Sequence, residues 1–260
     1  MLEGITETGL RPEMERLRGR DLGDKAIVVL GDSIVYGWGV SYEESYPALL
    51  EEFLNKGPQR GHRWRVVNAG VPGNTVLMGC ARYQRDVSAF HPQVVLLGYG
   101  LNDAALRRTH IDLQREVIRA GKGYPWARIA YVLRRWLVPR AHVGDIAHHE
   151  NSPRVRPRLY AAALRDLVRR VRRDGAQAYL ISLTPVSPDL PEEQRRHFQR
   201  YDEIIREIAR RCRVPLIDLH ETAENPFAPA TMWAGDGVHP RAAGQRWVAE
   251  SVGFYLLARV

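Results

Sequence analysis

The sequence predicts an α/β fold in which a parallel sheet of five strands is covered by helices on both faces. Five short apolar runs, rich in β-branched residues, recur along the chain. The segments between them can each hold at least one helix, as parallel crossovers require. Runs that are apolar at nearly every position are typical of strands buried on both faces. The expected strands are residues 26–30, 65–68, 93–98, 178–183 and 214–218.

Helical periods in the spacers support this fold. Two segments place apolar residues three and four positions apart, which is the pattern of a helix with one buried face. A third helix is expected to open with Pro240, since proline suits the first turn of a helix. The stripes are Leu159, Ala163, Leu167, Val168 and Val171 in one helix, Phe198, Tyr201, Ile204, Ile205, Ile208 and Cys212 in another, and Trp247, Val248, Val252 and Tyr255 in the last.

The length of 260 residues, without internal repeats, predicts a single domain over 1–260. The third crossover is far longer than usual, so we expect a helical insertion at about 104–157. Trp126, Tyr131 and Trp136 in this insertion either overhang a site at the sheet edge or pack the insertion onto the body. The sequence leaves both arrangements open.

The charge balance does not indicate a nucleic-acid partner, although the formal net charge is +8. All but three of the 38 basic residues are arginines, and many of them alternate with acidic residues on predicted helices. This pattern favours solvated helix faces over a basic groove. We therefore expect no nucleic acid, and the oligomeric state is left open.

Cellular location and cofactors are constrained by what the sequence lacks. No apolar run approaches the ~18 residues that span a bilayer, so no stable membrane insertion is expected. The first 25 residues contain no apolar signal segment, which favours a cytoplasmic protein. Cys80 and Cys212 lie far apart without metal-ligand spacing, and both are expected to be buried thiols.

Polar groups follow three of the predicted strands, where open parallel sheets bind their ligands. Gly31-Asp32-Ser33 follows the first strand, a turn containing Gly70 and Gly73 follows the second, and Asn102 follows the third. Each has a plain structural alternative. Asp32 and Ser33 suit a helix cap, the glycines suit a turn, and a lone asparagine is a common loop residue.

A fourth segment, near the end of the chain, places Asp236 three residues before His239. At this spacing the carboxylate can accept from one ring nitrogen and leave the other to take a proton from a serine. A turn with a surface histidine is the alternative. Acyl transfer needs an activated hydroxyl, an oriented base and donors for an oxyanion, and the four segments together supply all three.

Taken in order, the four segments resemble the sequence blocks of the SGNH/GDSL hydrolase family. The blocks are GDS, N-x-G-x-x-G, G-x-N-D and D-x-x-H-P, between residues 31 and 240. Ile34 departs from the leucine of the family name and leaves the serine in place. The rival serine-hydrolase signature G-x-S-x-G is absent, because Val35 occupies its last glycine position.

The resemblance implies a three-layer α/β/α sandwich of flavodoxin-like, SGNH hydrolase type. It also implies that Ser33 is the nucleophile, with His239 and Asp236 completing the triad, and that Ser33, Gly73 and Asn102 form the oxyanion hole. The expected enzyme cleaves small-molecule carboxylic esters with the short acyl chains that the family favours, and it needs no metal or organic cofactor. The alternatives are O-acyl transfer, carbohydrate O-acetyl ester hydrolysis, and a binding module without catalysis.

Two other clusters are weaker candidates for chemistry. His148-His149-Glu150 contains metal-ligand types, but adjacent side chains point in different directions, so a solvated loop is favoured. Asp218 and His220 form a second acid and base pair after the fifth predicted strand. That pair matches none of the family's blocks.

Overall fold

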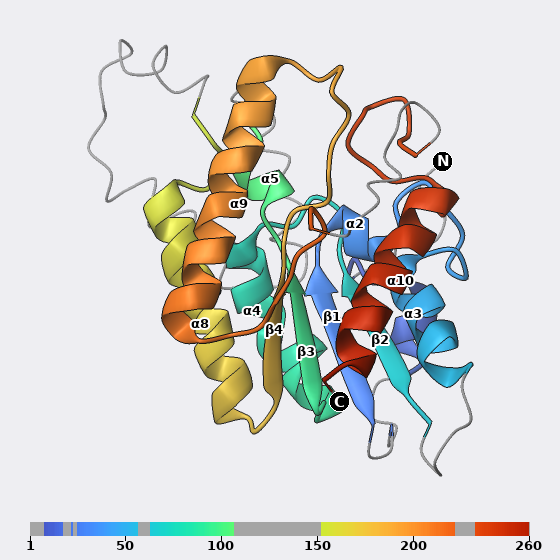
Figure 1. The fold of residues 1–260 in the computed structure, drawn as a ribbon. Helices are drawn as coiled ribbons and strands as arrows, with labels where there is room; N and C mark the ends of the chain where they lie inside the picture. Colours follow the sequence, from blue (N-terminus) through green and yellow to red (C-terminus); the bar gives the residue numbers. More distant parts are fainter. Residues whose placement is uncertain are drawn as a thin grey trace.

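The sheet is parallel throughout and has the strand order β2-β1-β3-β4-β5 (Figure 1). All five predicted strands are present. They are β1 (Ala26–Gly31), β2 (Arg65–Gly70), β3 (Val94–Gly98), β4 (Gln177–Ile181) and β5 (Leu216–Ile217). The computed structural model describes residues 8–17, 22, 25–56, 63–106, 152–221 and 232–259.

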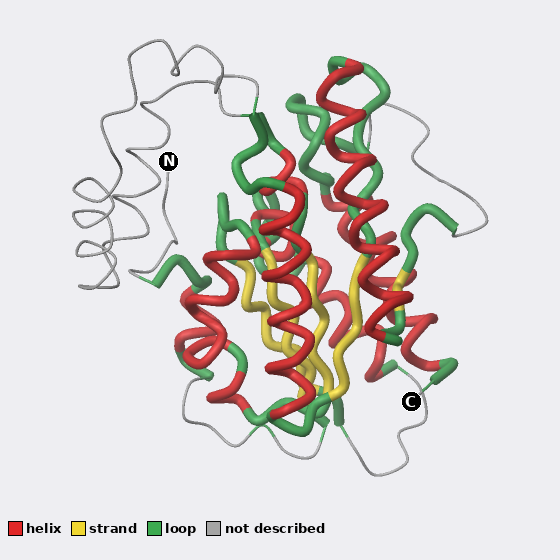
Figure 2. The backbone as a smooth tube through the Cα atoms, turned by 90° about the vertical axis from the view of Figure 1, so that its left-hand side faces the viewer, coloured by secondary structure: helices red, strands yellow, loops and turns green. Residues whose placement is uncertain are grey.

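Helices cover both faces of this sheet, which confirms the predicted α/β/α sandwich. Helices α3 (Tyr46–Asn55) and α10 (Ala242–Leu257) pack together on one face. The opposite face carries α4 (Val76–Asp86), α8 (Pro157–Arg173) and α9 (Glu192–Cys212), and the layers are separated in Figure 2. The short helices are α1 (Pro12–Glu15), α2 (Ser33–Tyr36), α5 (Leu101–Ala104) and the 3₁₀ helix η1 (Ser88–Phe90).

Two details of the predicted helices were wrong. Leu159 is 49% exposed, because the buried face of α8 runs through Tyr160, Leu164 and Leu167, and Leu159 is rotated by about 100° from it. Pro240 lies before α10 and not in its first turn. It pairs instead with Trp233 in an isolated antiparallel bridge.

The prediction that both thiols are buried was also wrong. Cys80 and Cys212 are free and only half-buried, because each lies at the margin of its helix's buried face. Burial still raises the pKa of Cys80 to about 11, so its thiol stays protonated at neutral pH. None of the helices in the described part of the chain is long and apolar enough to cross a bilayer.

A row of glycines crosses the carboxyl edge of the sheet. Gly31 at the end of β1 is in register with Gly70 of β2 and with Gly98 of β3. A Cβ atom on Gly70 would lie 2.2 Å from the backbone nitrogen of Tyr36, and one on Gly31 would lie 2.2 Å from Val35 Cγ2. Helix α2 therefore lies directly on the sheet, and only glycine permits this approach.

The segment before β1 also contacts α2, through the side chain of Arg11. Arg11 donates to the carbonyl oxygens of Tyr36, Gly37 and Val40 at 2.8–2.9 Å, and its guanidinium stacks on the Tyr36 ring. These carbonyls are at and beyond the C-terminal end of α2, where a helix leaves acceptors unsatisfied. A single arginine thus binds the whole turn that follows Ser33.

Gly70→Ala is expected to destabilise the protein because its methyl group collides with the backbone of α2. Overpacking against an immobile backbone costs about 2–3 kcal/mol, which corresponds to a loss of roughly 5–10 °C in the unfolding temperature. Gly235→Ala is the control, since a Cβ atom there meets nothing within 4 Å. Thermal unfolding measures both variants, and equal unfolding temperatures for Gly70→Ala and the wild type would refute the packing described.

Candidate active site

The first site residue begins the short helix that lies on the glycine row. Ser33 is the first residue of α2 and is 7% exposed. Asp32 precedes it and accepts the N–H of Ile34 at 3.0 Å, so it caps the helix. The alternative of a helix cap therefore holds for Asp32, while the hydroxyl of Ser33 is left to contact a residue from the other end of the chain.

That residue is His239. Its Nε2 atom lies 2.8 Å from Ser33 Oγ, and its Nδ1 atom lies 2.5 Å from Asp236 Oδ2. An ionised carboxylate can only accept, so the proton of the ring is on Nδ1 and the lone pair on Nε2 faces the serine. The predicted spacing of Asp236 and His239 thus brings the carboxylate, the imidazole and the hydroxyl into one chain of contacts.

The carboxylate of Asp236 is held in its ionised form. Partial burial alone would raise its pKa, but the backbone N–H groups of His239 and Val238, each at 3.0 Å, and the His239 ring outweigh that effect and lower the pKa. The turn itself is fixed from outside, because Ser187 N–H donates to the Gly237 carbonyl at 2.8 Å. Asp236 can therefore orient the ring at neutral pH.

The other two predicted residues follow β2 and β3, Gly73 in the turn after β2 and Asn102 in α5. Gly73 has a φ of 76°, which favours glycine, and its carbonyl oxygen accepts from Arg154 at 2.8 Å. The Nδ2 atom of Asn102 lies 3.1 Å from Asp32 Oδ2. An amide nitrogen carries two protons, so this contact uses one and leaves the second for another acceptor.

Asp103, the last residue of the G-x-N-D motif, has a buried carboxyl group. Its two oxygens accept the N–H of Val76 at 3.0 and 3.3 Å, at the first turn of α4. Burial raises its pKa to about 7, and the nearby charge of Asp32 adds to this, while the Val76 N–H and the positive charge of Arg154 oppose it. Asp103 thus joins the segment carrying Asn102 to the turn that carries Gly73.

The competing clusters are placed elsewhere. Asp218 forms a bidentate ion pair with Arg206. From His220, which is exposed, it accepts the backbone N–H at 2.9 Å. No group of three metal-ligand side chains occurs among the described residues. His148, His149 and Glu150, together with residues 107–151 of the predicted insertion, lie outside the described residues.

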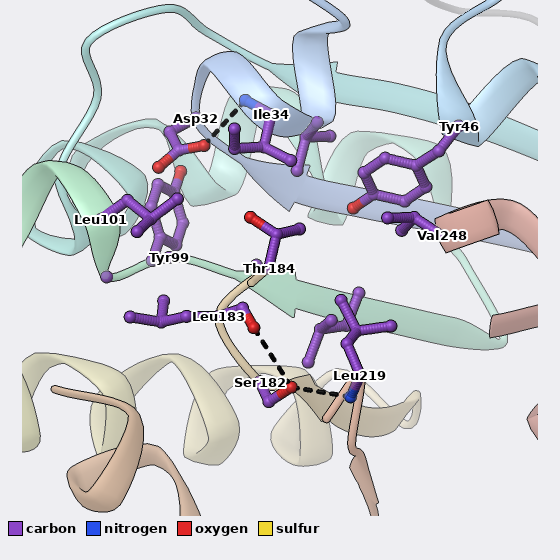
Figure 3. A pocket seen from close by; sticks show the side chains of 14 residues that line it. Asp32, Ile34, Tyr46, Tyr99, Leu101, Ser182, Leu183, Thr184, Leu219 and Val248 are labelled. Atoms are coloured by element: carbon purple, nitrogen blue, oxygen red, sulfur yellow. Dashed lines mark hydrogen bonds between the residues drawn. The ribbon is translucent and has the colours of Figure 1, made fainter. Parts of the chain in front are cut away.

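A pocket lies beside the turn that carries Ser33, but Ser33 itself does not line it. Its lining includes Asp32, Ile34, Tyr46 and Thr184, and Figure 3 shows Thr184 reaching from the end of β4 towards the turn of Asp32 and Ile34. The side chains of Ser33, His239 and Asn102 do not line it. This pocket is part of the core beneath the turn, so it does not define where a substrate lies.

Arg154, which contacts both Asn102 and Gly73, was not predicted from the sequence. It lies at the end of the predicted insertion, far along the chain from both. An arginine among 38 basic residues carries no motif, and no pattern in the sequence singles it out.

The strand order is that of a flavodoxin-like α/β/α fold, and the candidate residues Ser33, Gly73 and Asn102 follow β1, β2 and β3, at the edge where such sheets bind ligands. The chain belongs to the GDSL-like lipase/acylhydrolase family, whose model matches residues 29–247. It is therefore an acylhydrolase by class.

Individual relatives agree with this membership. An arylesterase from Vibrio mimicus is 21% identical over 226 residues, covering 87% of this chain and 85% of the relative. The esterase TesA from Pseudomonas aeruginosa is 30% identical over 93 residues, covering 36% of this chain and 45% of TesA. The solved structure of a lipase/acylhydrolase from Enterococcus faecalis has a TM-score of 0.63 at 17% identity, covering 91% of this chain and 97% of that one, and so shares its fold.

Asp103→Asn is expected to change how stability depends on pH. The folded pKa of Asp103, about 7, lies above the ordinary value of ~3.9 for an aspartate, so its contribution to stability is complete below the unfolded pKa and is lost as pH rises through about 7. Asparagine cannot ionise and can still accept from Val76. The unfolding temperature of the variant minus that of the wild type should therefore increase from about pH 5 to about pH 8. A difference that stays constant over this range would contradict the raised pKa.

Proposed function

We propose that this protein is a serine ester hydrolase that cleaves carboxylic esters, with short acyl chains preferred, through an acyl-enzyme on Ser33. The observation that carries the proposal is the position of His239, 2.8 Å from the Ser33 hydroxyl and 2.5 Å from the Asp236 carboxylate. An ester substrate is supported by the family and by the relative named arylesterase. The preference for short acyl chains rests on the family resemblance.

In the first half of the reaction, Ser33 Oγ attacks the ester carbonyl while His239 Nε2 takes the hydroxyl proton. Asp236 keeps the ring in the tautomer that accepts this proton and stabilises the cation that forms. His239 then gives the proton to the leaving alkoxide. In the second half, water loses a proton to His239 and attacks the acyl carbonyl. The bond between the acyl carbon and Ser33 Oγ then breaks, which releases the carboxylic acid, and His239 returns the proton to Ser33 Oγ.

The oxyanion of each tetrahedral intermediate would accept from three donors, the backbone N–H groups of Ser33 and Gly73 and the second amide proton of Asn102. The first proton of that amide is held by Asp32 at 3.1 Å. Donors fixed in advance stabilise charge that develops only in the transition state, so they raise kcat more than they lower KM. We further propose that residues 1–260 form one catalytic domain with the insertion at 104–157.

Ser33→Ala should leave a folded protein with at least about 10⁴-fold lower turnover, because the acyl-enzyme can no longer form. The measurement is hydrolysis of aryl esters from acetyl to dodecanoyl, with product analysis in the presence of a sugar or alcohol acceptor to detect acyl transfer. Ser187→Ala is the matched control. Its hydroxyl contacts Asp189 and takes part in no proposed step, and the substitution keeps the backbone N–H that binds the Gly237 carbonyl. Wild-type turnover by Ser33→Ala would disprove the proposed mechanism.

Asn102→Ala should lower kcat by about 10²–10³ and leave KM nearly unchanged, since it removes one of three oxyanion donors. Steady-state kinetics on one short-chain aryl ester separates the two constants. A rise in KM with kcat unchanged would mean that Asn102 binds the substrate and does not stabilise the oxyanion.

A further inference from the structure

The three proposed oxyanion donors come from the ends of three different strands, and one side chain contacts two of these segments. Arg154 Nη1 donates to the side-chain oxygen of Asn102 at 2.7 Å, and its Nη2 donates to the carbonyl oxygen of Gly73 at 2.8 Å. Short contacts of this kind, made by a charged donor, are among the stronger hydrogen bonds in proteins. The planar guanidinium thus sets the spacing between the Asn102 side chain and the Gly73 turn.

These contacts also decide which way the Asn102 amide faces. Its oxygen meets a cation, Arg154, and its nitrogen meets a carboxylate, Asp32, at 3.1 Å. If the amide rotated by half a turn, its NH₂ group would face the guanidinium and its oxygen would face the carboxylate, and both contacts would become repulsive. Arg154 and Asp32 therefore hold the amide in the orientation that presents its second proton.

The backbone of Arg154 is anchored next to the helix that carries Asn102. Arg154 N–H donates to the Ala105 carbonyl at 3.0 Å, and Val155 N–H donates to the Asp103 carbonyl at 3.1 Å. Leu106 and Pro153 pair as an antiparallel bridge just beyond. The chain that leaves the end of α5 thus returns beside it, and this return places the guanidinium between α5 and the Gly73 turn.

The charge of Arg154 matches its surroundings. Asp32 and Asp103 are both buried, and the positive charge of Arg154 lowers the pKa of each against the effect of burial. An oxyanion that forms between these segments would otherwise develop close to two carboxyl groups. A cation at this position reduces that repulsion as well as orienting the amide.

We propose that Arg154 is a positioning residue for ester hydrolysis, which acts by holding Asn102 and the Gly73 turn in the geometry of an oxyanion hole. This inference rests on the proposed function, because it assigns Arg154 a role in the same reaction. It predicts that Arg154 affects the transition state through Asn102 and contributes little to substrate binding.

The test is a double-mutant cycle between Arg154→Met and Asn102→Ala, with kcat and KM measured on one short-chain aryl ester. Arg154→Met alone should lower kcat by about tenfold to a hundredfold and leave KM nearly unchanged, less than the loss expected for Asn102→Ala. In the Asn102→Ala background the same substitution should cost at least about fivefold less, because only the link of Arg154 to Gly73 and its charge remain to be lost. If the double variant loses the full product of the two single-variant factors in kcat, the residues are not coupled and the proposal is overturned.

Two further variants exclude a merely structural effect. Arg170→Met removes an arginine that binds the Cys80 carbonyl at 3.0 Å and Asp166 from the last turn of α8, and it should keep wild-type kcat. Arg154→Lys keeps the charge but not the fork, so it should lie between Arg154→Met and the wild type in kcat. If Arg154→Met fails to fold, Arg154→Lys takes its place in the cycle, and full multiplication with Asn102→Ala again overturns the proposal.

Ser33→Ala is measured beside these variants so that two kinds of failure are distinguished. If Ser33→Ala is inactive and the cycle shows no coupling, only the role of Arg154 is wrong. If Ser33→Ala retains wild-type turnover, the acyl-enzyme mechanism is wrong and the role of Arg154 is lost with it. Coupling together with an inactive Ser33→Ala supports both.

Discussion

The close contact between α2 and the edge of the sheet is the constraint on which the site depends. Gly31 and Gly70 let the backbone of α2 approach to a distance that a Cβ atom would forbid, and Arg11 holds the far end of the helix. Because β1, β2 and β3 are parallel and in register, the residues that follow them emerge at one edge. Ser33, Gly73 and Asn102 are therefore neighbours although the chain separates them.

A second constraint is electrostatic. Two carboxyl groups, Asp32 and Asp103, are buried at the site. The proposed reaction generates a negatively charged oxygen beside them. Each carboxyl group has a structural task, since Asp32 caps α2 and Asp103 caps α4. Arg154 lies between the segments that they anchor. The same contacts thus serve folding and the proposed chemistry, so substitutions here are expected to affect stability as well as turnover.

The sequence predicted the sheet well because its central strands are buried on both faces and read as continuous apolar runs. The prediction was less good at the margin. The fifth expected strand, 214–218, is only Leu216–Ile217, since it pairs with β4 alone at the edge of the sheet. Leu159 and Pro240 were misplaced because a helical period and a proline preference do not fix where a helix begins or which way it is turned.

The candidate site was predictable where its residues follow strands or form a local pair. Ser33, Asn102, Asp236 and His239 all belong to short motifs, and the structure brings the first and the last two into direct contact. Arg154 was not predictable, because its role depends on two tertiary contacts and on no local pattern. Asp103 belongs to the G-x-N-D motif, but the sequence did not predict its raised pKa. That rise follows from burial in the folded chain.

The proposed mechanism requires Ser33 to be the nucleophile and His239 to activate it. Reaction with an aryl alkylphosphonate, followed by mass spectrometry of the intact chain and of its peptides, tests this directly. One phosphonyl group per chain is expected, on the peptide that contains Ser33, and it should form far more slowly in His239→Ala. Loss of ester turnover with the label on another residue, or labelling of Ser33 at an equal rate in His239→Ala, would contradict it.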